Sequence, residues 1–262
     1  MTDSLVQSWR QPETGRLLSV TFDWSTLVLW DRLLSAGRPD DPLWADLRAQ
    51  LGLFPGSDSV GRRMRLLALG RLAGAVMRSG VAGDVAECGC AAAVSTTLIA
   101  SQLQRGGFAG RLHVFDSFEG LSPPQAEDAV PPDMATPYGH QSNHGTNRRF
   151  AVPLDFVRAR LQAFPFIDLY QGWIPERFPE VADRRFALVN IDVDLYQPTR
   201  DALEFFWPRL SPGGAVFIDD FHIVDWPGAT RAVEDFVDGL PSPPAAVLPL
   251  ALGGIILRKG DA

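Results

Sequence analysis

Acidic side chains recur where apolar runs of this sequence end. The runs that read as strands finish at Glu87-Cys88-Gly89, at Asp116, at Asp192 with Asp194, and at Asp219-Asp220. Carboxylates that converge on one place repel one another unless positive charge lies between them. In open α/β sheets, ligands bind beyond the carboxyl ends of the strands, where the strand order reverses. We therefore expect a cationic cofactor and a metal ion at these strand ends.

Asp192, Asp219 and Asp220 are the predicted metal ligands. Two adjacent aspartates at the end of an apolar strand are costly unless their charges are neutralised. Three carboxylates make an all-oxygen site, which selects Mg²⁺, Mn²⁺ or Ca²⁺ over zinc. The alternative is that one aspartate of the pair caps the next helix and the other pairs with an arginine. Asp194 could reach the same face, but we expect it to help start the following helix.

The first two strands indicate a nucleoside cofactor. Asp116 stands 27 residues after Gly89, where an acidic side chain can accept both ribose hydroxyls. Residues 89–94 read GCAAAV and lack G-x-G-x-x-G, so no cradle for a pyrophosphate is present. This favours S-adenosylmethionine over NAD. The alternative is that Asp116 caps the following turn.

Three other features bear on the site. His222 directly follows the aspartate pair and is a candidate proton acceptor. Trp173, after Gly172, could stack on adenine or serve in packing. His140 and His144 have the spacing of a zinc pair, but no third soft ligand follows, so we expect no zinc there.

Strands and helices alternate from Gly83 onward, which predicts parallel βαβ units with helices on both faces of one sheet. The strand runs are apolar on both sides, as in a buried parallel sheet. Near the end of the chain, Gly253-Gly254 between two apolar runs predicts a hairpin at one sheet edge. Residues 117–150 lack periodicity, and a loop of that length is usually functional or disordered.

The amino-terminal 81 residues contain few strand signals. Apolar spacing predicts helices over Thr26–Ala36 and Val60–Arg78. Prolines break the region into pieces, so we expect a helical cap and not a separately folding domain.

Composition narrows the classes of function. The chain has 262 residues, and 24 Lys and Arg against 31 Asp and Glu give a net charge of −7. Such a chain is a poor general binder of nucleic acid or of an anionic membrane. The two cysteines, Cys88 and Cys90, are too close in sequence for a disulfide to be expected. We see neither a signal peptide nor a membrane-spanning run, and we expect a cytoplasmic protein.

The run NIDVDLYQPTRDALEFFWPRLSPGGAVFIDDF (190–221) resembles the macrocin and mycinamicin O-methyltransferase family. Supporting pieces are VAGDVAECG (81–89), HVFDSFEGL (113–121), QGWIPERF (171–178) and WPGATRAVEDF (226–236), in the order of that family. One departure is Ala93-Val94-Ser95, where the family usually has a stretch like Gly-Gly-Ser.

The resemblance implies an α/β, Rossmann-like class I methyltransferase fold, with a mostly parallel seven-stranded sheet over residues 82–262. It implies S-adenosylmethionine and a divalent cation, usually Mg²⁺, with residues 1–81 as cap and dimerisation segment of a homo-oligomer. Residues 117–150 would shape the acceptor pocket. The implied site residues are Asp192, Asp219 and Asp220 for the metal, and Glu87, Gly89, Ser95, Asp116, Ser117, Gln171, Gly172, Trp173 and Asp192 for the cofactor.

The predicted function is therefore metal-dependent methyl transfer to a sugar hydroxyl of a natural product. The catalytic candidates are Asp192 and His222, one of which would take the proton. No lysine lies within Asp192–Tyr196, so the lysine base of a catechol methyltransferase is missing. The alternatives are a phenol or polyketide hydroxyl as acceptor, or a non-catalytic binding or oligomerisation subunit. The missing glycine fingerprint speaks against an NAD-dependent oxidoreductase.

Overall fold

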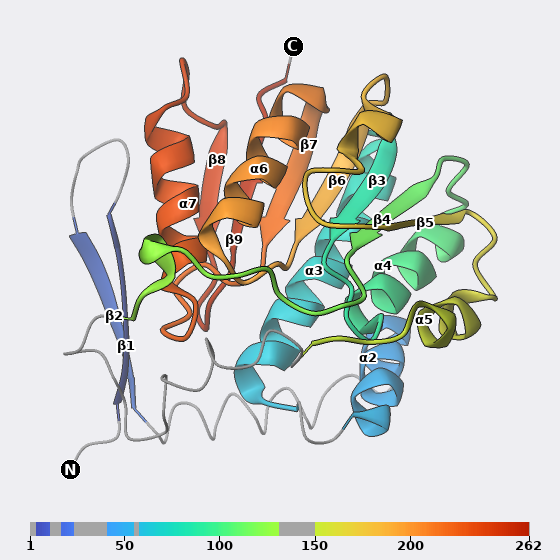
Figure 1. The fold of residues 1–262 in the computed structure, drawn as a ribbon, viewed down its shortest axis with the longest axis horizontal. Helices are drawn as coiled ribbons and strands as arrows, with labels where there is room; N and C mark the ends of the chain where they lie inside the picture. Colours follow the sequence, from blue (N-terminus) through green and yellow to red (C-terminus); the bar gives the residue numbers. More distant parts are fainter. Residues whose placement is uncertain (1–3, 11–16, 24–40, 55–57, 131–149, 262) are drawn as a thin grey trace.

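A mostly parallel sheet forms the centre of the molecule (Figure 1). The computed structural model describes residues 4–10, 17–23, 41–54, 58–130 and 150–261. Within these residues the sheet has seven strands: β3 (Asp84–Cys88), β4 (Leu112–Asp116), β5 (Ile167–Gln171), β6 (Phe186–Ile191), β7 (Leu210–Ile218), β8 (Ala246–Pro249) and β9 (Ile255–Arg258). The parallel α/β prediction is confirmed.

The strand order is β5-β4-β3-β6-β7-β9-β8. The chain runs outward from β3 to β5, then returns to the other side of β3 to build β6 and β7. Strand order therefore reverses between β3 and β6, and this is where such sheets bind ligands.

Helices cover both faces of this sheet (Figure 1). They are α2 (Pro42–Leu53), α3 (Val60–Ser79), α4 (Val94–Arg105), α5 (Leu154–Leu161), α6 (Tyr196–Phe206) and α7 (Pro227–Asp238). Apolar side chains of α3, α4 and α5 pack on one face of the sheet, and those of α6 and α7 pack on the other. Burial on both sides explains why β3, β4, β6 and β7 are mostly apolar, whereas the edge strand β5 (IDLYQ) is partly exposed.

Helix α3 confirms the amphipathic pattern of residues 60–78. The Ser59 hydroxyl accepts a hydrogen bond from the Arg62 amide at 3.2 Å, which caps the first turn. Gly80 ends the helix in the left-handed conformation, with φ of 67°. The buried residues of α3 include Leu69, Ala73 and Val76, and its arginines lie between the apolar positions.

Two outcomes concern the ends of the chain. Strands β8 and β9 form the expected antiparallel hairpin at the sheet edge, and Gly253 and Gly254 in its turn have φ of 96° and 86°. At the amino terminus, β1 (Ser4–Arg10) and β2 (Leu17–Asp23) form a separate two-stranded antiparallel sheet. The helical expectation for residues 1–81 is therefore wrong for these two segments. Residues 18–23 (LSVTFD) alternate apolar and polar side chains, a strand pattern that the sequence analysis missed. The helix predicted over residues 26–36 lies outside the described residues.

Among the described residues, every helix is too short or too polar to cross a lipid bilayer.

The Phe206 side chain offers a test of the core between the sheet and α6. It is fully buried and lies against the rings of Phe178 and Phe186, with centroid distances of 4.9 and 5.0 Å. We expect Phe206→Ala to lower the free energy of unfolding by about 3–5 kcal/mol, because it removes transfer energy and leaves a cavity. Urea denaturation measures this. Phe156→Ala on α5, where the ring is 44% exposed, is the control and is expected to change stability by less than about 1 kcal/mol.

Candidate functional site

The carboxyl ends of the inner parallel strands are level with one another. Cys88 pairs with Phe115 and with Ile191, and Ile191 pairs with Ile218. The next residues continue this alignment, since the Asp192 amide donates to the Cys88 carbonyl at 2.8 Å. The predicted acidic positions therefore meet at the edge of the sheet that the carboxyl ends of its strands form, beside the point where strand order reverses.

Three carboxylates come together at this edge. One carboxylate oxygen from each of Asp192, Asp194 and Asp220 lies within 4.8 Å of the other two. The Asp194 amide also donates to Asp220 Oδ2 at 3.2 Å, from a backbone with φ of 62°. Burial raises the pKa of both Asp192 and Asp220, and the neighbouring carboxylates raise it further. We call these three residues the carboxylate group.

Asp219, which the sequence predicts as a metal ligand, lies outside this carboxylate group, and its role at a metal stays a prediction. Its Oδ2 accepts a hydrogen bond from Arg65 Nε of α3 at 2.9 Å, in an ion pair whose side chains are 15% and 16% exposed. One aspartate of the pair thus has an arginine partner, which was the alternative reading of the sequence. Asp194, two residues after Asp192, is the third member of the carboxylate group.

The residues present fit a hard divalent cation. Three carboxylate oxygens converge, two of the side chains are destabilised by burial of their charge, and all the donor atoms are oxygen. A divalent cation bound there would remove the repulsion that raises these pKa values.

The loop after β3 runs against this group. Gly89 has φ of 81°, and a Cβ at this position would lie 1.9 Å from the Asp192 carbonyl oxygen. Only glycine therefore allows the two loops to approach so closely. The backbone conformation therefore requires glycine at position 89, and the cofactor contact of Gly89 stays a prediction.

Asp116 holds the same loop. Its Oδ2 accepts from the amides of Cys90 and Ala91 at 2.8 and 3.0 Å, and its Oδ1 accepts from the Phe118 amide at 2.7 Å. The turn-capping alternative is thus present in the structure. A carboxylate oxygen has two lone pairs, so a ribose contact at Asp116 stays compatible with this arrangement and stays a prediction.

Alanines take left-handed conformations where the chain enters α4. Ala91 and Ala93 have φ of 41° and 59°, and α4 begins at Val94 without a side-chain cap. Such conformations cost L-residues about 1–2 kcal/mol each. Ala93, which opens the Ala93-Val94-Ser95 departure from the Gly-Gly-Ser-like stretch, therefore carries backbone strain at the start of α4.

Glu87 lies beneath the loop and has no exposed surface. Its carboxylate accepts hydrogen bonds from Thr96 Oγ1, from Ser95, and from Asn190 Nδ2 at 2.9 Å. Burial raises the pKa of Glu87 to about 7, against the opposing effect of these hydrogen bonds. Glu87 and Ser95 thus join β3, α4 and β6 from within, and a direct cofactor contact would require this network to open.

The other predicted cofactor residues line the ends of β4 and β5. The Gly172 amide donates to the Asp116 carbonyl at 3.1 Å, so the turn after β5 lies beside Asp116. Gln171 is exposed and Trp173 is partly exposed, so both side chains are accessible to a ligand. Ser117 is buried, and its hydroxyl donates to the Gly120 carbonyl at 2.8 Å, which closes a local turn.

His222 follows the aspartates but is held differently. Its amide donates to Thr230 Oγ1 at 2.8 Å, and its ring stacks on Phe221 with a centroid distance of 4.0 Å. Burial lowers the pKa of His222 to about 4, so the ring is neutral at pH 7 and is a weak base. His140 and His144 lie outside the described residues.

Sequence reasoning missed two features of this site. It noted that Asp194 could reach the same face as Asp192 but favoured helix initiation for it, whereas the Asp194 carboxylate lies with those of Asp192 and Asp220. It assigned no role to Arg65, because a helix periodicity does not show which strand end an arginine will meet.

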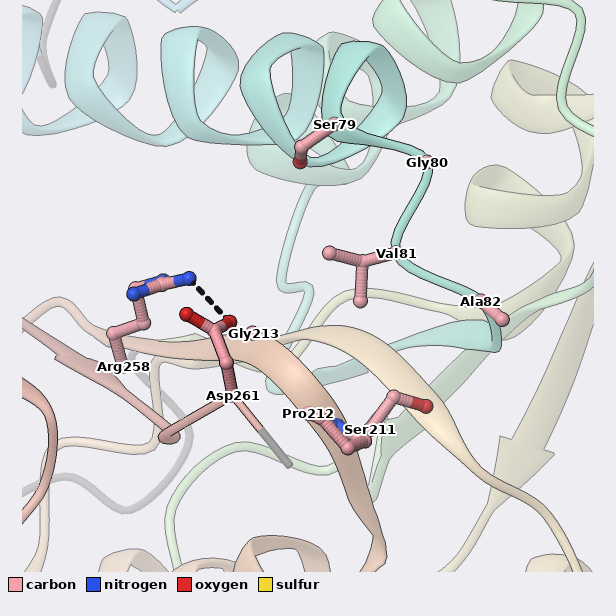
Figure 2. A pocket seen from close by; sticks show the side chains of 9 residues that line it. All are labelled: Ser79, Gly80, Val81, Ala82, Ser211, Pro212, Gly213, Arg258 and Asp261. Carbon is pink, nitrogen blue, oxygen red and sulfur yellow. Dashed lines mark hydrogen bonds and ion pairs between the residues drawn. The ribbon is translucent and has the colours of Figure 1, made fainter.

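A cavity of about 510 Å³ lies at the opposite end of the strands (Figure 2). It is lined by residues 79–82 before β3, by residues 211–213 at the start of β7, and by Arg258 and Asp261, which form an ion pair at 2.8 Å. The cavity is therefore separate from the carboxylate group, at the amino ends of the parallel strands.

Comparison with known sequences identifies a family. Residues 54–243 match the profile of a family described as macrocin-O-methyltransferase (TylF). The 8-demethyl-8-(2,3-dimethoxy-alpha-L-rhamnosyl)-tetracenomycin-C 4'-O-methyltransferase of Streptomyces olivaceus is 38% identical over 154 residues, 56% of this chain and 56% of the relative. Mycinamicin III 3''-O-methyltransferase of Micromonospora griseorubida is 31% identical over 167 residues, 62% of this chain and 63% of the relative. The matches thus span less than two thirds of these relatives.

Solved structures establish the fold. The O-methyltransferase NovP has a TM-score of 0.62 and 23% identity, over 76% of this chain and 80% of that chain. The calicheamicin methyltransferase CalS11 has a TM-score of 0.58 and 24% identity, over 87% of this chain and 97% of that chain. With the sheet described above, these likenesses confirm the class I methyltransferase fold.

The buried Glu87 predicts a pH dependence of stability. Its pKa is about 7 in the folded chain against 4.5 ordinarily, so between these values the folded chain keeps a proton that the unfolded chain has lost. The free energy of unfolding therefore falls as pH rises through this window. We expect Glu87→Gln, which buries no charge, to remove this fall and to gain up to about 3 kcal/mol over the wild type above pH 7.

Urea denaturation at about pH 5 and about pH 8 measures the effect of Glu87→Gln. Glu204→Gln is the control, since this side chain is 54% exposed and bonded to Arg200 on the helix surface. Identical pH slopes for the wild type and Glu87→Gln would contradict the prediction.

Proposed function

Since this chain belongs to the macrocin-O-methyltransferase (TylF) family, we propose that it is an S-adenosylmethionine-dependent O-methyltransferase that acts on a sugar hydroxyl of a natural product with the help of a divalent cation. The observation that carries the proposal is the carboxylate group at the reversal of strand order, beside the loop after β3. This is where the fold would bring a cofactor and an acceptor together.

The relatives support a glycosylated acceptor. Two of them are named for methylation of a rhamnosyl tetracenomycin and of mycinamicin III. A third, 28% identical over 166 residues, is the demethyldecarbamoylnovobiocin O-methyltransferase of Streptomyces niveus. Their named acceptors differ, so the class of acceptor transfers to this chain as a proposal and the individual compound does not.

The reaction forms a bond between the acceptor oxygen and the methyl carbon, and breaks the bond between that carbon and the sulfonium sulfur. The loop after β3, held by Asp116, would position the cofactor, and Gln171 to Trp173 would border its adenine. Holding the acceptor in line with the methyl group supplies much of the rate enhancement.

The acceptor proton needs a base, and we propose Asp192 for this role. His222 is a weak base because burial lowers its pKa to about 4, and this leaves Asp192, which follows β6 where strand order reverses, as the candidate. A divalent cation held by the carboxylate group would lower the pKa of the acceptor hydroxyl and fix its direction. Asp219 is close enough to raise the pKa of Asp192, so it is the fourth carboxylate at this site.

Substitutions in the carboxylate group test this proposal. We expect Asp192→Asn and Asp220→Asn each to lower the rate of methyl transfer by about 10²–10⁴-fold, since a ligand or base is lost. Both variants should also lose Mn²⁺ binding in calorimetry, and Asp220→Asn should keep S-adenosylmethionine binding. Asp238→Asn at the exposed end of α7 is the control. Wild-type rates in either site variant with chelator present would overturn the metal role.

The acceptor class is tested by paired substrates. The purified chain is incubated with S-adenosylmethionine and with matched glycosylated and sugar-free natural products, and mass spectrometry detects the added methyl group. Methylation confined to the glycosylated member supports the proposal. Methylation of the sugar-free member points to a phenol or polyketide acceptor, and cofactor binding without transfer to either class points to a non-catalytic subunit.

A homo-oligomer formed through residues 1–81 and a cytoplasmic location complete the proposal. Sedimentation at micromolar concentration tests the assembly, and a monomer would remove that part alone.

A further inference from the structure

Arg65 brings a built-in positive charge to the four carboxylates at the end of the sheet. It extends from α3, which precedes the methyltransferase sheet in the chain, and its Nε donates to Asp219 Oδ2 at 2.9 Å. Its Nη1 donates to the Leu252 carbonyl at 3.2 Å, in the turn between β8 and β9. The guanidinium is therefore held by two separate elements, and the Arg65 side chain is only 15% exposed.

Glycine at position 254 lets the β8–β9 turn pack closely against the Arg65 side chain. Gly254 has φ of 86°, and its amide donates to the Phe221 carbonyl at 2.8 Å. A Cβ at Gly254 would lie 3.3 Å from Arg65 Cδ, tighter than an ordinary contact. The β8–β9 turn thus packs closely along the arginine stem, so its position beside Asp219 is set by the fold.

The charge of Arg65 reaches beyond its direct partner. Asp219 directly precedes Asp220 in the chain, so the guanidinium that binds Asp219 lies beside the carboxylate group. Arg65 therefore offsets part of the charge of a site that carries four carboxylates, together with Arg62, whose charge acts on Asp192.

We propose that Arg65 is a positioning residue that competes with the divalent cation: it holds Asp219 away from the carboxylate group and offsets the charge of that group when no cation is bound. This inference rests on the metal site of the proposed function. A cation arriving at the carboxylate group meets both a repelling positive charge and one carboxylate that is already paired. Arg65 therefore weakens cation binding and stabilises the cation-free chain.

Mn²⁺ binding to the full-length chain tests this inference, measured by electron paramagnetic resonance of the free ion without cofactor. We expect Arg65→Gln to bind Mn²⁺ about tenfold more tightly than the wild type, because one unit of opposing charge is removed near the site. Arg65→Lys, which keeps the charge, should stay near the wild-type affinity. Arg63→Gln is the matched control, since Arg63 lies on the same helix as Arg65 and pairs with Asp58, just before that helix.

Thermal unfolding in chelator gives a second readout. Arg65→Gln should have a lower Tm than Arg63→Gln, and added Mn²⁺ should raise its Tm more than that of the wild type. Unchanged or weaker Mn²⁺ affinity in Arg65→Gln overturns this inference while the metal site stands. Absence of Mn²⁺ binding in both the wild type and Arg65→Gln overturns the metal site, and this inference with it. If Arg65→Gln does not fold, Mn²⁺ affinity in Arg65→Met decides in the same way.

Discussion

Repulsion among carboxylates at one end of a buried sheet is the constraint that organises this molecule. The parallel strands end level, and the pairing of β6 with β7 brings Asp192, Asp194 and Asp220 to one place beside the reversal of strand order, with Asp219 next to them. Such a cluster is stable only if positive charge or bound protons compensate it. Among the described residues, the guanidinium groups of Arg65 and Arg62 supply positive charge there, and the site has the donor chemistry for a divalent cation as well.

Helix α3 therefore has a role beyond covering the sheet. Its apolar side packs into the core through residues such as Leu69 and Ala73, and its polar side delivers Arg65 to Asp219. A helix that lies before the first strand of the sheet thus contributes to the same site as the last two strands, whose turn holds Arg65 through the Leu252 carbonyl. Packing and electrostatics of the site are coupled through this one side chain.

The loop after β3 is the second organised element. Glu87, just before the loop, binds Thr96 of α4 and Asn190 of β6, and Asp116 accepts hydrogen bonds from the loop amides. Both carboxylates use their hydrogen bonds on the protein itself, so they act first as scaffold. The left-handed alanines at 91 and 93 show that this scaffold holds a conformation for which glycine would be the ordinary choice.

Local pattern was enough to predict the alternation of strands and helices, helix α3, the terminal hairpin and the placing of acidic residues at strand ends, because periodicity and turn residues act over a few positions. It also showed that Asp192 and Asp220 would lie in one site. The pairing of Asp219 with Arg65, the entry of Asp194 into the carboxylate group and the burial of Glu87 were decided only by tertiary structure. Arg65 and Asp219 are 154 positions apart, and a contact over that distance depends on how the whole sheet and its helices pack.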